Sequence, residues 1–250
     1  MASRANVQVW QIEKPIKERE SAALRGVPLF STLSANLIGL LANVVSTRQY
    51  PKNTFVLSSG DKTDSLYIIL SGVVKVAITD DDGKEVILSF LGPGDFFGEM
   101  ALIDDHPRSA DIVTREPCEL IIIEQGDFKK CLAMSPALSM QIMLALVSRL
   151  RDADRKIESL ALVNVYGRVA QVLLESAAQV NGVLAIDRKL TRQDIARLVG
   201  ASREMVTRVM RDLVDGDYIR VETKRIVLHP KLEVYAREIG HAHTHAGKAK

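Results

Sequence analysis

The 250-residue chain lacks the features that define several large protein classes. It has only two cysteines, Cys118 and Cys131, and they do not have the spacing of metal ligands, so we expect neither a disulfide framework nor an iron–sulfur cluster. No apolar run approaches the roughly 20 residues of a membrane span, and the amino terminus lacks a basic stretch followed by an apolar one. We therefore expect a cytoplasmic protein that does not associate with a membrane.

The sequence also lacks the residue patterns of catalysis. No nucleophile–base pair, metal-ligand cluster or phosphate-binding P-loop can be assembled from it, so we expect no enzymatic activity, no metal site and no bound cofactor. The net charge is only +2. Residues 187–230 nevertheless hold ten lysines and arginines against seven acidic residues, so the excess of positive charge lies in one segment. A chain of this length most often forms two domains.

The first half of the chain carries a β-rich pattern. Residues 1–28 form an expected N-terminal arm, loosely ordered over 1–25, and a short helix is predicted over Ser31–Val45 with Ser34 as its N-cap. Turn signals, including Asp82-Gly83, then separate short apolar runs. The runs predict strands over 54–57, 65–70, 73–79, 84–91 and 118–123. Many short strands at about ten-residue spacing predict an antiparallel jelly roll over residues 29–135.

One segment interrupts the strand rhythm with residues suited to an anion. Gly98 permits a close backbone approach, and Glu99–Ile103 can form a short helix whose first amide groups would face a phosphate. Arg108 offers a planar fork of donors, Ser109 offers a hydroxyl, and Glu99 can accept a hydrogen bond from a ribose hydroxyl. We interpret this segment as a phosphate pocket, with the Arg108 side chain serving the ligand rather than the core.

A long helix is predicted to follow over residues 136–161. Apolar residues repeat on it at alternating spacings of three and four, which is the pattern of a helix seam. The seam residues are Met140, Met143, Val147, Leu150, Asp154, Ile157 and Ala161. A carboxylate on an apolar seam often sets register or meets a ligand, so we favour a parallel homodimer over a buried helix of one subunit.

Residues 162–232 predict a winged helix-turn-helix. Thr191 is a natural N-cap for one helix, Gly200 lies where the turn requires a positive φ, and Ser202 caps the second helix. A hairpin over 218–228 supplies the wing. The tail, residues 233–250, is compositionally a disordered end. The predicted fold is thus α+β, with a jelly roll, a long dimerisation helix and a winged helix-turn-helix.

These motifs resemble the cyclic AMP receptor protein family, also called the CRP/FNR regulators, over about residues 29–230. The resemblance implies that Glu99 contacts a ribose and that Arg108 and Ser109 hold a cyclic phosphate. Ser89, Gly98 and Met100 would line the same pocket. It also implies a homodimer in which the cyclic nucleotide is an allosteric effector. DNA and RNA polymerase are the other implied partners.

The chain departs from the family at the residues expected to contact the nucleobase of the effector. Family members that bind cyclic AMP present a Thr-Ser pair from the long helix to the adenine, whereas this chain has Ala153-Asp154. An ionised carboxylate accepts hydrogen bonds only, so it suits guanine N1–H and N2 and repels adenine N1. Arg151 and Arg155 are available for phosphate or the guanine Hoogsteen edge. We therefore favour cyclic di-GMP, with cyclic AMP as the alternative because Arg108-Ser109 is retained.

The second helix of the motif carries the residues expected to read DNA. Arg203, Glu204 and Arg208 match the residues with which family members read a palindromic, TGTGA-like site, and arginine can pair with guanine O6 and N7. Thr207 lies on the same face. The expected phosphate contacts are Lys189, Thr191, Arg192 and Ser202. A ligand-independent or redox-sensing regulator and the regulatory subunit of a kinase or channel are the other functions considered.

Overall fold

The computed structural model describes residues 17–180, 182–186, 190–223 and 225–241. The chain divides into two compact units, Met1–Ile78 with Ser89–Leu146, and Thr79–Leu88 with Val147–Lys250. Helix α5, Pro136–Leu162, contributes residues to both units. The predicted linking helix, residues 136–161, is therefore one continuous helix, as the absence of glycine and proline after Pro136 indicated.

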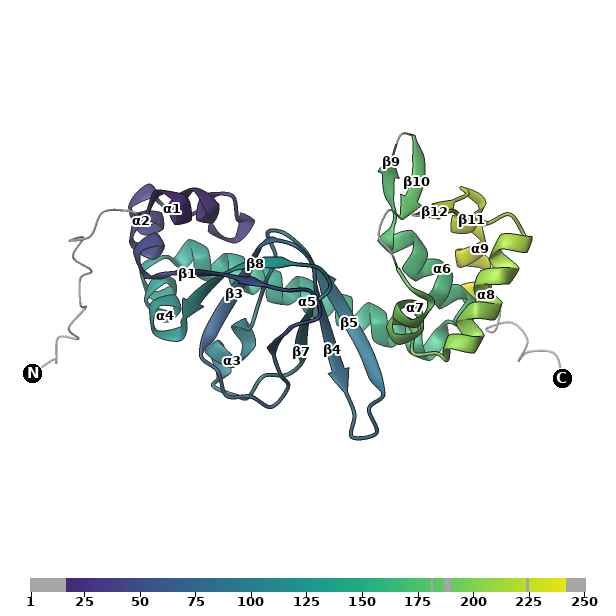
Figure 1. The fold of residues 1–250 in the computed structure, drawn as a ribbon, viewed down its shortest axis with the longest axis horizontal. Helices are drawn as coiled ribbons and strands as arrows, with labels where there is room; N and C mark the ends of the chain where they lie inside the picture. Colours follow the sequence, from purple (N-terminus) through teal and green to yellow (C-terminus); the bar gives the residue numbers. More distant parts are fainter. Residues whose placement is uncertain (1–16, 181, 187–189, 224, 242–250) are drawn as a thin grey trace, which may run out of the picture. The chain divides into compact units, whose positions relative to one another are not determined.

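The strands between residues 46 and 124 form two four-stranded antiparallel sheets (Figure 1). One sheet has the order β1-β8-β3-β6 and the other has the order β2-β7-β4-β5. The bounds of the strands are β1 Ser46–Tyr50, β2 Phe55–Leu57, β3 Ser65–Ser71, β4 Val74–Thr79, β5 Glu85–Leu91, β6 Phe96–Phe97, β7 Asp111–Thr114 and β8 Cys118–Glu124. This arrangement confirms the predicted β-rich domain.

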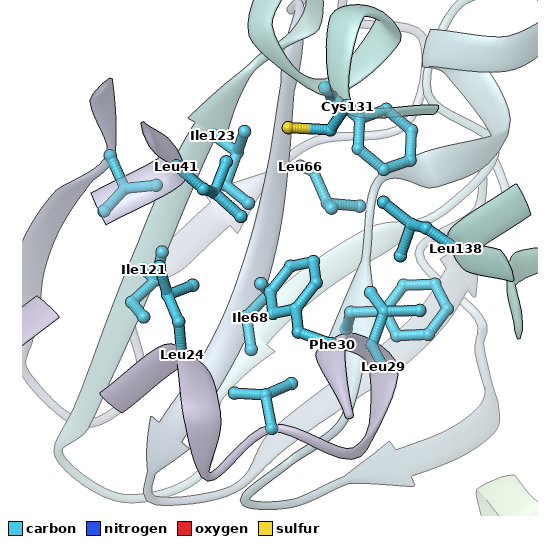
Figure 2. Close-up of a cluster of buried hydrophobic side chains, with 14 of the residues drawn as sticks. Leu24, Leu29, Phe30, Leu41, Leu66, Ile68, Ile121, Ile123, Cys131 and Leu138 are labelled. Atoms are coloured by element: carbon cyan, nitrogen blue, oxygen red, sulfur yellow. The ribbon is translucent and has the colours of Figure 1, made fainter. Parts of the chain in front are cut away.

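Strands β3 and β8 are buried on both faces, which explains their almost continuous apolar sequence. Alternate side chains of a strand point to opposite faces, so Leu120 and Ile122 pack between the two sheets. Ile121 and Ile123 point the other way, into a core closed by helices (Figure 2). The sequence run thus supplies two cores from one strand.

Helices close this second core. They are α1 Glu18–Arg25, the 3-10 turn η1 Pro28–Phe30, α2 Ala35–Val44, α4 Gln125–Met134 and the first half of α5. Helix α2 and its cap Ser34 were predicted, and the Ser34 hydroxyl accepts from the Leu37 N–H. The expectation of a loosely ordered arm over 1–25 is wrong for residues 18–25, because Leu24 on α1 is completely buried in the core. Residues 1–16 lie outside the described part of the chain.

The second unit holds helices α6 to α9 with a third antiparallel sheet of order β11-β12-β10-β9. Its elements are α6 Val165–Ser176, β9 Ala178–Val180, β10 Val183–Ile186, α7 Arg192–Val199, α8 Arg203–Asp215, β11 Ile219–Val221, β12 Ile226–Leu228 and α9 Lys231–His241. Helix α9 corrects the prediction of a disordered tail over 233–241, because Leu232 and Ala236 are buried against the core of this unit. Residues 242–250 lie outside the described residues.

Two turns between strands of the β-rich region place glycine at a positive φ in different surroundings. Gly72 has φ +88°, and a Cβ there would lie 2.5 Å from the Pro117 carbonyl oxygen and 2.6 Å from Cys118 Sγ. Gly83, in the β4–β5 turn, has φ +78° with no heavy atom within 4 Å of such a Cβ. The first glycine is therefore required by conformation and by space, and the second by conformation alone.

We predict that Gly72→Ala lowers the free energy of unfolding by about 3–5 kcal/mol, because it adds overpacking to the cost of a left-handed alanine. Gly83→Ala is the matched control and is expected to cost about 1–2 kcal/mol, the conformational part alone. Denaturant unfolding followed by circular dichroism measures both values. Equal losses in the two variants would contradict the packing argument.

Candidate functional site

The predicted phosphate pocket begins where strand β6 ends. Gly98 adopts φ +87° and is followed by helix α3, Glu99–Asp104, close to the helix predicted over 99–103. A Cβ at position 98 would lie 2.7 Å from Arg108 Nη1 and 2.9 Å from the Ser65 carbonyl oxygen. Glycine is therefore required here so that β3, β6 and the arginine can approach one another.

Arg108 is built into the protein by three hydrogen bonds. Its Nε donates to Thr63 Oγ1 at 2.7 Å, Nη1 donates to the Gly98 carbonyl at 2.5 Å, and Nη2 donates to the Ser65 carbonyl at 2.7 Å. The residue is only 5% exposed. The expectation that this side chain serves the ligand rather than the core is wrong in part, because the guanidinium also joins three segments of the fold.

Burial and neighbouring charges act on this guanidinium in opposite directions. Desolvation lowers the pKa of Arg108, whereas Tyr67, Asp64, Glu99 and Asp61 raise it electrostatically. Arginine remains charged in proteins even so, because its ordinary pKa is far above neutrality. The structure therefore places a buried cation in the predicted pocket, with acidic residues close enough to act on it electrostatically.

The other predicted cassette residues lie around this cation. Glu99 is 1% exposed, at the start of α3, and interacts electrostatically with Arg108. Ser109 is exposed, and its hydroxyl lies 3.9 Å from the sulfur of the exposed Met100. Ser89 is half-buried on β5, and no hydrogen bond joins it to these described cassette residues. The structure thus brings Gly98, Glu99 and Arg108 together, with Met100 and Ser109 beside them.

Sequence reasoning missed two residues of this site. Thr63 and Ser65 hold the Arg108 side chain, but they lie more than forty positions before it in the chain. The sequence showed only that Ser65 begins a strand. No local pattern at Thr63 indicates the contact, because the approach depends on how the loop after β2 folds back over the sheet.

Helix α5 carries the remaining predicted effector residues. Arg151, Asp154 and Arg155 are exposed in this single chain. Arg155 forms an ion pair with Asp152, its neighbour one turn before, and not with Asp154. Asp154 has no hydrogen bond or ion pair with any described residue. Its carboxylate is therefore open to a partner from outside the chain.

The apolar seam of α5 is exposed as well. Met140, Met143, Val147, Leu150 and Ile157 each have at least 46% of their surface accessible. Lys156, which the sequence did not single out, turns away from this exposed side and donates to the carbonyls of Ile87 at 2.6 Å and Leu88 at 3.3 Å. Burial lowers the pKa of this amine. A single chain thus leaves one long apolar stripe without cover.

The helix-turn-helix is formed by α7 and α8. Thr191 and Asp194 form a capping box at the start of α7, Gly200 ends it with φ +63°, and the Ser202 hydroxyl accepts from the Met205 N–H. These are the predicted caps and turn, and they are confirmed. The inward face of α8 consists of the buried side chains of Val206, Val209, Met210 and Leu213.

The opposite face of α8 holds the predicted DNA-reading residues. Arg203, Glu204 and Arg208 are exposed, whereas the half-buried Thr207 donates its hydroxyl to the Arg203 carbonyl at 2.8 Å. Thr191, Arg192 and Ser202 lie exposed at the starts of the two helices, where first-turn N–H groups suit phosphate oxygens. The predicted phosphate contacts are thus exposed at the starts of α7 and α8. Lys189 lies outside the described residues.

The cysteines and the possible metal ligands bear on the other functions considered. Both cysteines are buried and unpaired, and burial raises the pKa of Cys131 to about 11, so its thiolate is suppressed. Among the described residues, no group of three or more metal-ligating side chains occurs. Among the same residues, no single helix is long and apolar enough to cross a membrane. The bent pair α4–α5 is long and apolar enough only when its two helices are taken together, by length and composition alone.

Comparisons with known proteins match both halves of the chain. The family model for the cyclic nucleotide-binding domain matches residues 47–135, and that for the Crp-like helix-turn-helix domain matches residues 167–232. The cAMP-activated global transcriptional regulator CRP of Pasteurella multocida is 37% identical over 185 residues, which cover 72% of this chain and 88% of that protein. A CRP-like cAMP-activated global regulator of Mycobacterium tuberculosis is 32% identical, covering 80% of this chain and 91% of that one.

A solved structure matches the fold as well. The c-di-GMP-responsive global regulator CLP of Xanthomonas campestris has a TM-score of 0.69 and 31% identity, covering 78% of this chain and 99% of that one. A sensor domain with a cyclic nucleotide cassette and a Crp-like helix-turn-helix together define a cyclic nucleotide-responsive transcription regulator. The chain belongs to the CRP/FNR family, as the sequence resemblance indicated. This family consists of DNA-binding regulators, which are not a class of enzymes.

The structural role of Arg108 yields a prediction about folding. We expect Arg108→Ala to lower the free energy of unfolding by about 2–4 kcal/mol, because the carbonyls of Gly98 and Ser65 lose their charged donor in a buried site. The neighbouring Ser109→Ala, at an exposed position, is the control and is expected to change stability by less than about 0.5 kcal/mol. Thermal and urea unfolding measure both. An Arg108→Ala protein as stable as the Ser109→Ala protein would contradict the structural role.

Proposed function

We propose that this regulator binds cyclic di-GMP and that the nucleotide changes its affinity for a palindromic, TGTGA-like DNA site. The observation that carries the choice of effector is Asp154, an exposed carboxylate on α5 without a partner among the described residues. Guanine offers N1–H and the N2 amine side by side to such a group, and adenine does not. Arg151, exposed one turn before it, supplies a cation for a second phosphate.

The cassette supplies the first phosphate contact in this proposal. The buried cation of Arg108 and the exposed hydroxyl of Ser109 donate to the phosphate oxygens, and Glu99 accepts from a ribose hydroxyl. In this proposal Gly98, Met100 and Ser89 line the rest of the phosphate pocket. Arg155 assists through the phosphate or the guanine Hoogsteen edge after its exposed ion pair with Asp152 opens, and such pairs contribute little energy.

Cyclic AMP is the second candidate effector. It is favoured by the retained Arg108-Ser109 and by the names of the curated relatives, which are cAMP-activated regulators. It is disfavoured by Ala153, which has no group that can hydrogen-bond a base. The CLP structure, a c-di-GMP-responsive regulator, favours the guanine nucleotide. Neither the relatives nor the fold decides between them, so the decision rests on titration.

The exposed seam of α5 supports a parallel homodimer as the active form. Side chains such as Leu150 and Ile157, each more than 60% exposed, gain apolar burial when a second copy of the same helix covers them. A two-fold dimer also presents two copies of α8 to the two halves of a palindrome. RNA polymerase is the further partner of this proposal, and the cytoplasm is its location.

The DNA-reading residues divide into two groups in the proposal. Arg203, Glu204 and Arg208 reach base edges from the first turns of α8, with Thr207 beside them. Thr191, Arg192, Ser202 and Lys189 contact phosphates. Thr191 and Ser202 are also helix caps that accept from the Asp194 and Met205 N–H groups, so they fix the first turns that the proposal directs towards the DNA backbone.

We predict that Arg203→Ala weakens binding to the specific site by about 1–3 kcal/mol and leaves binding to random DNA nearly unchanged, because it loses a bidentate pair with guanine. Arg192→Ala is the matched control. It should weaken binding to both DNAs alike and reduce by about one the slope of log affinity against log salt concentration. Fluorescence anisotropy at several salt concentrations measures both variants. Equal losses on specific and random DNA for Arg203→Ala would show that the residue contacts only phosphate.

We predict that the wild-type protein binds cyclic di-GMP more tightly than cyclic AMP. Changing Ala153-Asp154 to Thr-Ser should weaken the binding of cyclic di-GMP by about tenfold or more, because guanine N1–H and N2 lose their acceptor. Glu158→Ser, which removes a carboxylate from an exposed position one turn later, is the control and should leave both affinities unchanged. Calorimetric titration decides between the candidates. Tight cyclic AMP binding by the wild type, with no cyclic di-GMP response, would overturn the guanine assignment.

A further inference from the structure

The loop between β2 and β3 forms hydrogen bonds with both the main chain and the side chain of Arg108. The Arg108 N–H donates to the Asp61 carbonyl at 2.9 Å, and its carbonyl accepts from the Gly60 N–H at 2.8 Å. Two residues further along the loop, Thr63 Oγ1 accepts from Arg108 Nε at 2.7 Å. The same short loop therefore fixes the position of both the Arg108 backbone and its guanidinium.

We propose that Thr63 is a positioning residue for the phosphate of the effector. The inference rests on the proposed function, in which that phosphate meets Arg108. With Nε held by Thr63 and the two terminal nitrogens held by the Gly98 and Ser65 carbonyls, the guanidinium plane is fixed before a ligand arrives. Each terminal nitrogen carries one more N–H, and these two donors serve the phosphodiester oxygens.

The chemical nature of the three acceptors is the reason for assigning this role. A hydroxyl and two carbonyls satisfy the buried donors without bringing a negative charge. The positive charge of Arg108 consequently stays available to an anion. A carboxylate at position 63 would satisfy Nε equally well as a hydrogen bond, but it would neutralise the cation and repel the phosphate.

Nearby carboxylates make this distinction matter. Asp64, Glu99 and Asp61 already act electrostatically on Arg108, yet among the described residues its guanidinium donates to an uncharged hydroxyl and two carbonyls, and not to these carboxylates. Thr63 occupies the Nε donor that a carboxylate of the loop would otherwise take. Its hydroxyl thus keeps the arginine directed to the phosphate and away from Asp64, its neighbour in the chain.

The test compares substitutions at position 63 in the full-length protein, with cyclic di-GMP and cyclic AMP as probes. Thr63→Ser keeps the hydroxyl and should bind within about twofold of the wild type. Thr63→Asp should keep or raise the melting temperature, since it adds a charged acceptor for Arg108, yet weaken nucleotide binding at least about tenfold. Residue 63 is exposed, and aspartate has nearly the volume of threonine, so the new side chain has room.

Lys62→Gln is the matched control, because it makes the same change of net charge at an exposed neighbour that does not contact Arg108. It should weaken binding by less than about threefold. If Thr63→Asp binds like Lys62→Gln, the positioning role is refuted. If Thr63→Asp fails to fold, Thr63→Val decides the question: about fivefold weaker binding supports the role, and wild-type affinity overturns it. A wild-type protein that binds neither nucleotide refutes the proposed function itself, independently of Thr63.

Discussion

The guanidinium of Arg108 is buried among oxygens that carry no charge, and the rest of the sensor domain is arranged around that constraint. A buried cation is costly unless its donors are satisfied, so the Gly98 and Ser65 carbonyls and the Thr63 hydroxyl must converge on it. Convergence in turn requires glycine at position 98, where any Cβ would meet the arginine. Helix α3 begins directly after this glycine, at Glu99.

The second half of the protein depends on hydrogen bonds at helix ends, one of them made by the buried carboxylate of Asp194. Thr191 with Asp194 and Ser202 with the Met205 N–H fix the first turns of α7 and α8, which the proposed function directs towards DNA. Four inward side chains of α8 hold it against its own domain, so its arginines are free to face outward. Capping thus decides both where the helices begin and which residues they present.

The sequence predicted the elements that have a local signal and missed those that do not. Strand β8 and helix α8 were predicted because an apolar run and a 3.6-residue period are visible within one element. Strand β1, Ser46–Tyr50, was missed because its residues are mostly exposed and its formation depends on pairing with β8, over seventy positions later. Helices α1 and α9 were missed for a similar reason, since each contributes only a few buried side chains to a core built by other segments.

The same distinction separates the predictable part of the site from the rest. Glu99, Arg108 and Ser109 were found because they stand close together in the chain, whereas Thr63 and Ser65 reach the arginine only through the fold. The sequence predicted that Arg108 meets a ligand but not that it also holds the loop and two strands together. Residues with two roles of this kind are hidden from sequence patterns, because each role depends on a different set of neighbours.

The central claim is that one chain couples a cyclic nucleotide site to a DNA-reading helix. The direct measurement is the affinity of the wild-type protein for a palindromic TGTGA-like duplex at fixed salt, over a series of cyclic di-GMP and cyclic AMP concentrations. The account predicts that one nucleotide, cyclic di-GMP, changes the DNA affinity by at least about fivefold, within the usual range of allosteric coupling. The same DNA affinity at saturating concentrations of both nucleotides would contradict it.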